Sequence, residues 1–267
     1  MLNKRDDQST RIKKLRPIDD IFFEVFANDK AVCQEILRTI LQDNQLEVQE
    51  VDVQKDLRNL NGRSVRLDAL CMLKTGELCN IEVQRGDTDD HVKRAHYNGA
   101  CAMLLNSEPG TKFGEIPTVY VIYITEFDPF DGNKTIYHGK FMIDELGEER
   151  QSGINCIFVN AKVDDGSDIA DLMRCFMQTE VNEPKFPAFT DRMKFLKEDK
   201  KGERIMGNVI KEYAKEYAEE CVQTFDKNKT DKLILKALKK GWDTETICDA
   251  FEVDEKRVEE VRALMKD

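Results

Sequence analysis

Two carboxylates and one amide stand on neighbouring segments of the chain, at a spacing that can support metal-assisted hydrolysis. Asp68 lies in one apolar segment, and Glu82 and Gln84 lie in the next. A three-residue turn that ends at Gly76 would join the two segments into a hairpin and place Asp68 opposite Glu82. Two carboxylates facing each other about 5 Å apart repel unless a cation or a proton lies between them.

The same register separates the polar from the apolar side chains of the hairpin. It places Arg66 opposite Gln84 and Leu70 opposite Asn80, on the face that carries the acids. The other face collects apolar or small side chains, namely Val65, Leu67, Ala69, Cys71, Leu73, Cys79, Ile81 and Val83. Because successive residues of a strand point to opposite faces, a slip of one residue would break up both sets.

A hard divalent cation is the ion that such a pair of acids would hold. Mg²⁺ takes oxygen ligands and usually keeps several waters, so two carboxylates and a backbone carbonyl would leave positions for a phosphate and an attacking water. Gln84 lies on the same face as Glu82 and could hydrogen-bond that water. The alternative interpretation is a hairpin with one solvated face, on which acidic, amide and basic side chains are ordinary.

The segments before and within the hairpin have clear periods. Apolar residues at helical spacing after Pro17 predict one or two helices that end near Asp43. A period-two pattern then begins at Val48 and continues to the end of the hairpin, with a turn signal at Asn61-Gly62.

The segments after the hairpin alternate between the two periods. Residues 91–105 predict a helix, with Asp89 or Asp90 able to accept from its first free amides. Residues 118–125 are β-branched, aromatic and apolar throughout, which predicts a central strand buried on both faces. Shorter β-like segments and one helix follow, over residues 140–143, 154–159 and 168–177.

From Asp191 onward the pattern is helical. One stripe of this part, typical of a core or a partner-facing seam, consists of Ile205, Val209, Ile210, Tyr213, Tyr217 and Cys221. Gly241 suits a left-handed helix stop, and Asp243 and Asp254 each suit the start of a further helix. Because the last segment is rich in acidic residues, we predict a packing or partner-binding hairpin rather than a DNA-binding helix-turn-helix.

Composition and charge limit the classes of function. The 267 residues include few prolines and glycines, which excludes disorder over most of the chain. The net charge of -11 excludes binding of nucleic acid by bulk electrostatics. Residues 1–16 are locally basic, and we predict a flexible N-terminus there. No apolar run is long enough to cross a membrane and no signal peptide is present, which predicts a cytoplasmic protein with no membrane partner.

The cysteines and histidines do not form a metal-binding pattern. The eight cysteines contain no C-x-x-C pair, and we interpret them as reduced core thiols. His91, His96 and His138 have no metal-ligand spacing, and we interpret them as surface or packing residues.

Three segments of the sequence together resemble a known family. Asp68, followed by Glu82-Val83-Gln84 on a paired strand, resembles the core of the PD-(D/E)XK nuclease superfamily. The segments that extend this likeness are Leu67-Asp68-Ala-Leu-Cys, Asn80-Ile-Glu82-Val-Gln84-Arg and Asp89-Asp90-His-Val-Lys93-Arg94-Ala-His-Tyr97-Asn. They resemble the PD-(D/E)XK transposases that include the recombination-promoting Rpn nucleases. The likeness runs from Leu15 to about Ile124 and is looser beyond.

The resemblance implies a fold and a set of metal ligands. The fold is an α/β restriction-endonuclease-like core over residues 17–190, with a mixed central sheet flanked by helices, and a helical extension over residues 191–267. The cofactor is Mg²⁺ or Mn²⁺, and its ligands are Asp68, Glu82 and the backbone carbonyl of Val83.

The resemblance also implies roles for the neighbouring residues. Gln84 occupies the position of the superfamily's catalytic lysine, and a neutral amide can orient water but lacks the positive charge of lysine. The candidates for a compensating cation and for contacts with DNA phosphates are Arg66, Arg85, Lys93, Arg94 and, for phosphate contact only, Tyr97. Asp19 or Asp20 would add an accessory acid, although we favour capping of the first helix as their role.

Three hypotheses follow from this sequence. The leading one is a divalent-metal-dependent DNA endonuclease in which water is the nucleophile, linked to recombination or mobile elements. The second is a nuclease fold that cuts weakly or not at all and binds DNA or protein partners. The third is an oligomerisation scaffold, in which the C-terminal helices form a homodimer with Tyr213 and Tyr217 at the seam.

Overall fold

The computed structural model describes residues 9–58, 64–87 and 90–263. The chain forms two compact units, Met1–Val209 and Ile210–Asp267. The helix α7 (Lys200–Lys239) belongs to both, because the boundary falls within it. The division at residue 190 that the sequence suggests remains a prediction about which segments fold independently.

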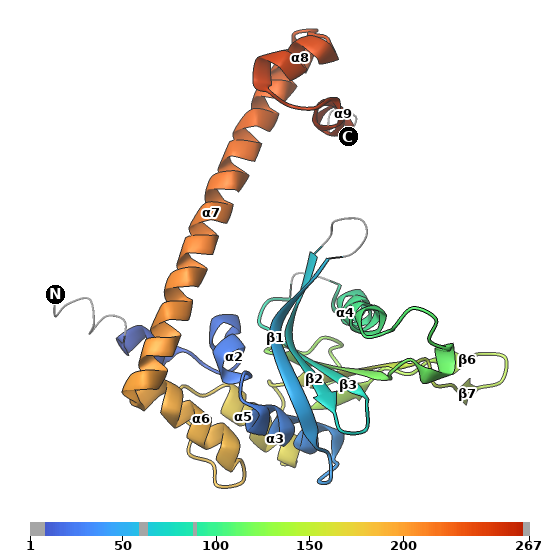
Figure 1. The fold of residues 1–267 in the computed structure, drawn as a ribbon, viewed down its shortest axis with the longest axis vertical. Helices are drawn as coiled ribbons and strands as arrows, with labels where there is room; N and C mark the ends of the chain where they lie inside the picture. The colour runs from blue at the N-terminus through green and yellow to red at the C-terminus, as the bar shows by residue number, and fades with distance from the viewer. Residues whose placement is uncertain (1–8, 59–63, 88–89, 264–267) are drawn as a thin grey trace. The chain divides into compact units, whose positions relative to one another are not determined.

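Within the described residues, six strands form one mixed sheet in the order β1-β2-β3-β4-β8-β5 (Figure 1). The strands β1 (Val48–Arg58), β2 (Ser64–Leu73) and β3 (Leu78–Gln84) are antiparallel. The next two, β4 (Val119–Thr125) and β8 (Ile154–Asn160), continue the sheet in parallel. This arrangement confirms the expected α/β fold and the central position of the apolar strand.

The hairpin β2–β3 has the predicted register. Leu70 pairs with Asn80, and Gly76 takes the left-handed conformation at φ 91°. The β2–β3 pairing ends at Ala69 and Ile81, whereas β2 stays paired with β1 and β3 with β4 beyond that point. The two strands therefore fork apart next to Asp68. The turn predicted at Asn61-Gly62 lies outside the described residues.

Helices cover both faces of the sheet (Figure 1). The helix α4 (His91–Leu105) covers one face, where its Ala95 and Ala102 pack with Leu70, Val121 and other strand residues. On the other face lie α2 (Asp20–Phe26), α3 (Lys30–Leu41), α5 (Asp168–Phe176) and α6 (Pro187–Glu198). Aromatic rings join three of these helices, through Phe22, Phe23, Phe26, Phe176 and Phe189.

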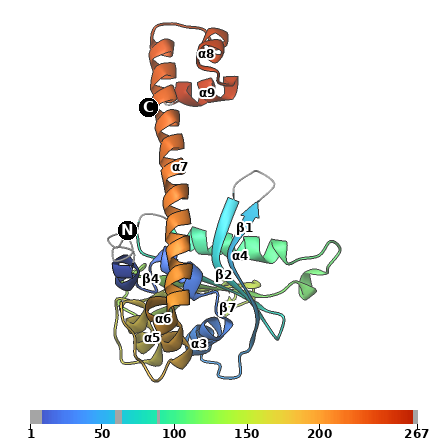
Figure 2. The same ribbon diagram turned by 60° about the vertical axis from the view of Figure 1, so that its left-hand side comes forward.

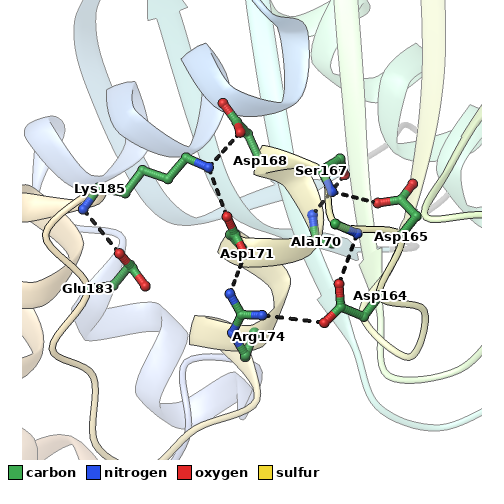
Figure 3. Close-up of polar contacts among 10 residues, drawn as sticks. Asp164, Asp165, Ser167, Asp168, Ala170, Asp171, Arg174, Glu183 and Lys185 are labelled. Atoms are coloured by element: carbon green, nitrogen blue, oxygen red, sulfur yellow. Dashed lines mark hydrogen bonds and ion pairs between the residues drawn. The ribbon is translucent and has the colours of Figure 1, made fainter.

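Side-chain contacts fix the start of α5 (Figure 3). The Ser167 hydroxyl accepts from the Ala170 N–H, the usual role of serine before a helix. Lys185 pairs with Asp168 and Asp171, and Arg174 pairs with Asp171 and, at 3.3 Å, with Asp164. These exposed pairs hold the loop before α6 against α5.

The described part of the basic N-terminus is not a free arm. Residues 9–14 are helical and Ile12 is buried, whereas the flexibility expected of residues 1–16 stays a prediction. The ammonium of Lys197 in α6 donates to the backbone carbonyls of Lys13 and Leu15, which ties the segment to the first unit. Residues 1–8 lie outside the described part of the chain.

Short strands complete the first unit. An edge strand, β5 (Ile136–His138), pairs with β8, and a small hairpin consists of β6 (Met142–Ile143) and β7 (Glu148–Glu149). The pattern over residues 140–143 predicted β6, but no sequence signal gave β5 or β7. Of the described cysteines, all are free thiols and most are buried, as expected.

The second unit is a small helical assembly (Figure 2). Gly241 has the left-handed conformation, and α8 (Thr244–Phe251) and α9 (Glu255–Ala263) follow, with Asp243 and Asp254 accepting from backbone amides at their starts. Their core includes Ile234, Ala237, Ile247, Val258 and Val261. No described helix of either unit is long and apolar enough to cross a membrane.

The two arginines of α9 have acidic partners within the unit. Arg257 pairs with Asp231 and Glu260, and Arg262 pairs with Glu259. This pairing agrees with a packing hairpin rather than a phosphate-binding one. Tyr213 is exposed on α7, whereas the Tyr217 side chain lies outside the description, so a dimer seam there remains a prediction.

Candidate active site

The two acids of the hairpin meet where β2 and β3 fork apart. The Val83 N–H donates to Oδ2 of Asp68 at 2.9 Å, and the Asp68 N–H lies 3.4 Å from Oε1 of Glu82. Each carboxylate thus accepts a hydrogen bond from a backbone N–H of the opposite strand. These bonds take the place of the backbone hydrogen bonds that would otherwise continue the β2–β3 pairing. The fork explains why the two carboxyl groups lie close enough to interact.

Burial controls the ionisation of this pair. Glu82 is buried and Asp68 is half-buried. Desolvation raises the pKa of Asp68 to about 7, with a further contribution from the negative charge of Asp20. Desolvation and repulsion by Asp68 raise the pKa of Glu82 to about 8. In the absence of a cation, the acid pair therefore retains protons near neutral pH.

One oxygen of Glu82 has no donor. Oε1 accepts from Nδ2 of Asn80 at 2.8 Å, whereas the buried Oε2 has no hydrogen-bond partner among the described residues. A buried carboxylate oxygen left unsatisfied is destabilising, and a bound cation would satisfy it. The residues present therefore fit a divalent cation.

The ligand set for a cation is small. Within the described part of the chain, no group of three or more His, Cys, Asp or Glu residues is arranged to hold a metal. The N–H and C=O of one strand residue point to the same side, so the Val83 carbonyl faces the fork together with the N–H that binds Asp68. Two carboxylates, this carbonyl and waters are the available donors.

Gln84 is held by Arg94. Nη1 of Arg94 donates to Oε1 of Gln84 at 2.8 Å, and Nε2 of Gln84 donates to the Gly86 carbonyl at 2.8 Å. Arg94 lies in the first turn of α4, where the Asp90 side chain caps the helix by accepting from the Lys93 N–H. The positive charge of Arg94 also opposes the rise in the pKa of Asp68 and Glu82.

An ion-pair cluster lies beside the acids. Arg85 contacts Asp19 and Glu126 at 3.1 Å each, and Arg16 contacts Glu126 at 2.8 Å and Asp19 at 3.2 Å. The cluster joins the segment before α2 to the carboxyl ends of β3 and β4. Two carboxylates balance the two guanidinium groups, so Arg85 is already paired.

Asp19 and Asp20 have different positions. Asp19 precedes α2, but its carboxylate accepts from the Arg16 N–H at 2.7 Å and makes no capping bond, which corrects the capping role favoured from the sequence. The negative charge of Asp20 contributes to the raised pKa of Asp68. Desolvation raises the pKa of Asp20 itself, against the attraction of Arg85 and Arg94.

The other sequence candidates surround the pocket less closely. Arg66 is exposed on β2, and its charge lowers the pKa of Asp68 relative to burial alone. Lys93 is exposed and pairs with Asp90 at 2.8 Å, and Tyr97 is half-buried on α4. The predicted contacts of these residues with DNA phosphate remain predictions.

Two residues of the pocket region were absent from the sequence prediction of the site. Asn80 stands two positions before Glu82 on the same face of an apolar strand, and that isolated polar residue was an available signal. Glu126 follows the central strand, and nothing in its local pattern indicates the ion pairs with Arg16 and Arg85. His91 is buried against Tyr123, with Nδ1 3.2 Å from the hydroxyl, as expected of a packing residue.

Comparison with known families agrees with this geometry. The family model described as PD-(D/E)XK nuclease family transposase matches residues 17–250. The chain belongs to this family. No curated protein and no solved structure matches the chain.

Membership of the PD-(D/E)XK nuclease family transposases bears directly on the pocket. The match contains the fork, both acids and the N-terminal part of α4. It supports a nuclease- or transposase-like role, and PD-(D/E)XK nucleases generally use divalent metals and act on DNA.

Proposed function

We propose that this protein is a DNA endonuclease that depends on Mg²⁺ or Mn²⁺, of the Rpn-like type linked to recombination or mobile elements. The observation that carries the proposal is the convergence of Asp68 and Glu82 at the fork, with one buried oxygen of Glu82 unpartnered. Family membership supports the reaction class, the hydrolysis of a phosphodiester bond.

Each residue of the pocket has a distinct role in this proposal. Asp68, Glu82 and the Val83 carbonyl would hold the divalent ion. When bound, such an ion lowers the pKa of a coordinated water and polarises a phosphoryl oxygen. Gln84 orients water through its amide, and Asp20 adds negative charge at the edge of the pocket. The nucleophile is water, so no covalent enzyme intermediate forms.

Plasmid nicking tests the proposal. We expect the wild type to nick supercoiled plasmid in Mg²⁺ or Mn²⁺ and to stop when EDTA is added. Asp68→Ala and Glu82→Gln should each lose at least about 100-fold in rate, because each removes one charged ligand. Glu108→Gln is the matched control, since Glu108 is exposed and lies beyond the end of α4. Equal cleavage by all four proteins would reject the assignment.

A second candidate function is a nuclease fold that binds but cuts weakly or not at all. Gln84 in place of lysine, with both ends of its amide engaged, favours this alternative, as does the net charge of -11. Calorimetric titration with Mn²⁺ separates the two. Binding without any cleavage would support the binding module, whereas binding with cleavage would support the endonuclease.

The proposal includes the setting of the protein. We expect it to act on DNA in the cytoplasm, without a membrane partner, and to form a homodimer through the C-terminal helices. Sedimentation of the full chain and of Tyr213→Glu tests the dimer, because a charge at an exposed seam position should shift the protein towards monomer.

A further inference from the structure

The amide of Gln84 has a defined orientation in this structure. A glutamine side chain can present either its oxygen or its nitrogen to a neighbour, but a guanidinium has donors only. Because Arg94 donates to Oε1 at 2.8 Å, the oxygen must face α4 and Nε2 must face the other way. Nε2 has two N–H groups, of which one donates to the Gly86 carbonyl at 2.8 Å. Gln84 is thus fixed as a hydrogen-bond donor.

The charge of Arg94 also acts on the acids. Its charge lowers the pKa values of Asp20, Asp68 and Glu82 relative to burial alone, so its field reaches all three carboxylates. By contrast, Arg85 shares two carboxylates with Arg16.

The other two basic candidates have different surroundings. Lys93 pairs with Asp90 on the exposed side of α4. Arg66 lies beyond the point where the β2–β3 pairing ends. Of the predicted cations, Arg94 therefore combines a direct bond to Gln84 with an effect on every acid of the pocket.

We propose that Arg94 is a positioning residue that makes Gln84 a donor, and that its guanidinium supplies the positive charge which lysine provides elsewhere in the superfamily. The inference rests on the proposed function, because it assigns roles within the same hydrolytic pocket. A lysine side chain supplies both a positive charge and a hydrogen-bond donor. In this protein Arg94, in the first turn of α4, would supply the charge, and Gln84, at the end of β3, would supply the donor. A charge fixed beside a developing anion stabilises a transition state without reorganisation.

A double-mutant cycle tests this division of roles. The variants are Arg94→Gln, Gln84→Lys and the pair combined, measured by single-turnover cleavage of a DNA duplex. We expect Arg94→Gln alone to slow cleavage by about 100-fold. In the Gln84→Lys background the same change should slow cleavage by less than about 3-fold, because the lysine brings its own charge and donors.

Additive effects would overturn the inference. If Arg94→Gln costs the same factor in both backgrounds, Arg94 acts on DNA or on folding and not through Gln84. Arg150→Gln is the matched control, because Arg150 is exposed and its guanidinium contacts Glu148 and the Glu149 carbonyl in the β7 region. This control should cleave like the wild type.

Metal affinity provides a readout independent of cleavage. In calorimetric titrations with Mn²⁺, Arg94→Gln should bind as tightly as the wild type or more tightly, because both acids remain and a repelling charge is gone. Weaker binding in proportion to the lost cleavage would overturn the inference, since Arg94 would then support the ion site itself. A wild type that binds Mn²⁺ without cleaving would reject the proposed function and this inference together, whereas additive effects in an active enzyme would reject only the inference.

Discussion

At the scale of single residues, Asn80 determines how Glu82 is presented. Its Nδ2 donates to Oε1 of the Glu82 carboxylate at 2.8 Å, and the buried Oε2 has no hydrogen-bond partner among the described residues. The Asn80 side chain is itself fully buried, and its own Oδ1 has no partner among the described residues. A buried oxygen without a hydrogen bond is destabilising. Asn80 therefore lowers the stability of the fold while it positions Glu82.

This arrangement predicts the effect of Asn80→Ala. Loss of the hydrogen bond removes an interaction that favours the charged form of Glu82, and the pKa of Glu82 should rise further. We expect the Mn²⁺ affinity to fall by about 10-fold, as for other residues that orient metal ligands. Calorimetric titration at constant pH measures this effect.

Asn106→Ala is the matched control for this change. Asn106 donates to the Ala102 carbonyl at 2.8 Å at the end of α4 and loses the same chemical group on substitution. The two variants should differ clearly in Mn²⁺ affinity. Equal affinities would mean that Asn80 has no part in presenting Glu82.

The sequence predicts some residues of the pocket better than others. Alternation along two adjacent strands was enough to bring Asp68 and Glu82 together, because a hairpin register follows from local turn chemistry. The Arg94 contact with Gln84 depends on how α4 docks on the sheet, which no local period encodes. The sequence therefore placed Arg94 near the site and suggested phosphate binding or charge compensation, without indicating the hydrogen bond it makes.

At the scale of elements, Gly99 sets how closely α4 approaches the sheet. A Cβ atom at this position would lie 2.8 Å from Cγ2 of Ile154 and 3.0 Å from Cγ2 of Val121. Both distances are too short for carbon atoms, so any side chain would push the helix or the strand residues away. The docking of α4 matters because the helix carries Arg94.

Gly99→Ala should therefore destabilise the first unit, although alanine normally favours a helix by about 0.5–1 kcal/mol over glycine. Overpacking costs about 1–3 kcal/mol, so we expect a net loss of about 1–2 kcal/mol. Gly114→Ala is the control, because a Cβ atom there meets nothing within 4 Å. Greater stability of Gly99→Ala than of the wild type would contradict the tight docking of α4.

The probe for this measurement matters. Trp242 is the only tryptophan of the chain and lies in the second unit, so its fluorescence does not report on α4. Hydrogen exchange of amides in β4 and β8 follows the first unit directly.

Sequence patterns predicted the long elements well and the short ones poorly. The helix over residues 91–105 was predicted because an acidic cap and a helical period coincide. The strands β5 and β7 are two or three residues long, too short to show a period, and pairing with a neighbour defines them. The fork between β2 and β3 also lies outside local pattern, because both strands remain regular on their other sides.

At the scale of the whole molecule, the raised pKa values link pocket ionisation to stability. Asp68 and Glu82 have folded pKa values of about 7 and about 8, above their ordinary values of 3.8 and 4.5. A raised carboxyl pKa means that the folded protein binds more protons than the unfolded chain. This contribution to stability is fully present below about pH 4 and is lost as pH rises through 7 and 8.

We therefore expect the first unit, in EDTA, to unfold at progressively lower temperature as pH rises from 5 to 8. Added Mn²⁺ should raise the unfolding temperature more at pH 8 than at pH 6, because protons compete with the cation. Differential scanning calorimetry measures both effects. In Glu82→Gln the unfolding temperature should decrease less with rising pH. If it decreases as much as in the wild type, groups other than Glu82 cause the effect.

The family and the net charge could be predicted from the sequence, because each depends on many residues along the chain and not on one contact. The helical pattern after residue 191 suggests one extension. In the structure α6 buries Phe189, Met193 and Leu196, and the compact units divide at Val209. The boundary near residue 190 therefore stays a prediction about which segments fold independently. Burial of a helix face depends on its partner, which periodicity alone does not identify.

The hydrogen bond from the Val83 N–H to Asp68 has one more consequence. The Val83 amide proton is hydrogen-bonded to the Asp68 carboxyl group and not to a neighbouring strand. Its NMR chemical shift should therefore respond to the charge of Asp68. In an isotope-labelled sample, one backbone signal thus serves as an internal indicator of whether the pocket holds a proton or a cation. It can be read without substrate, turnover or any substitution.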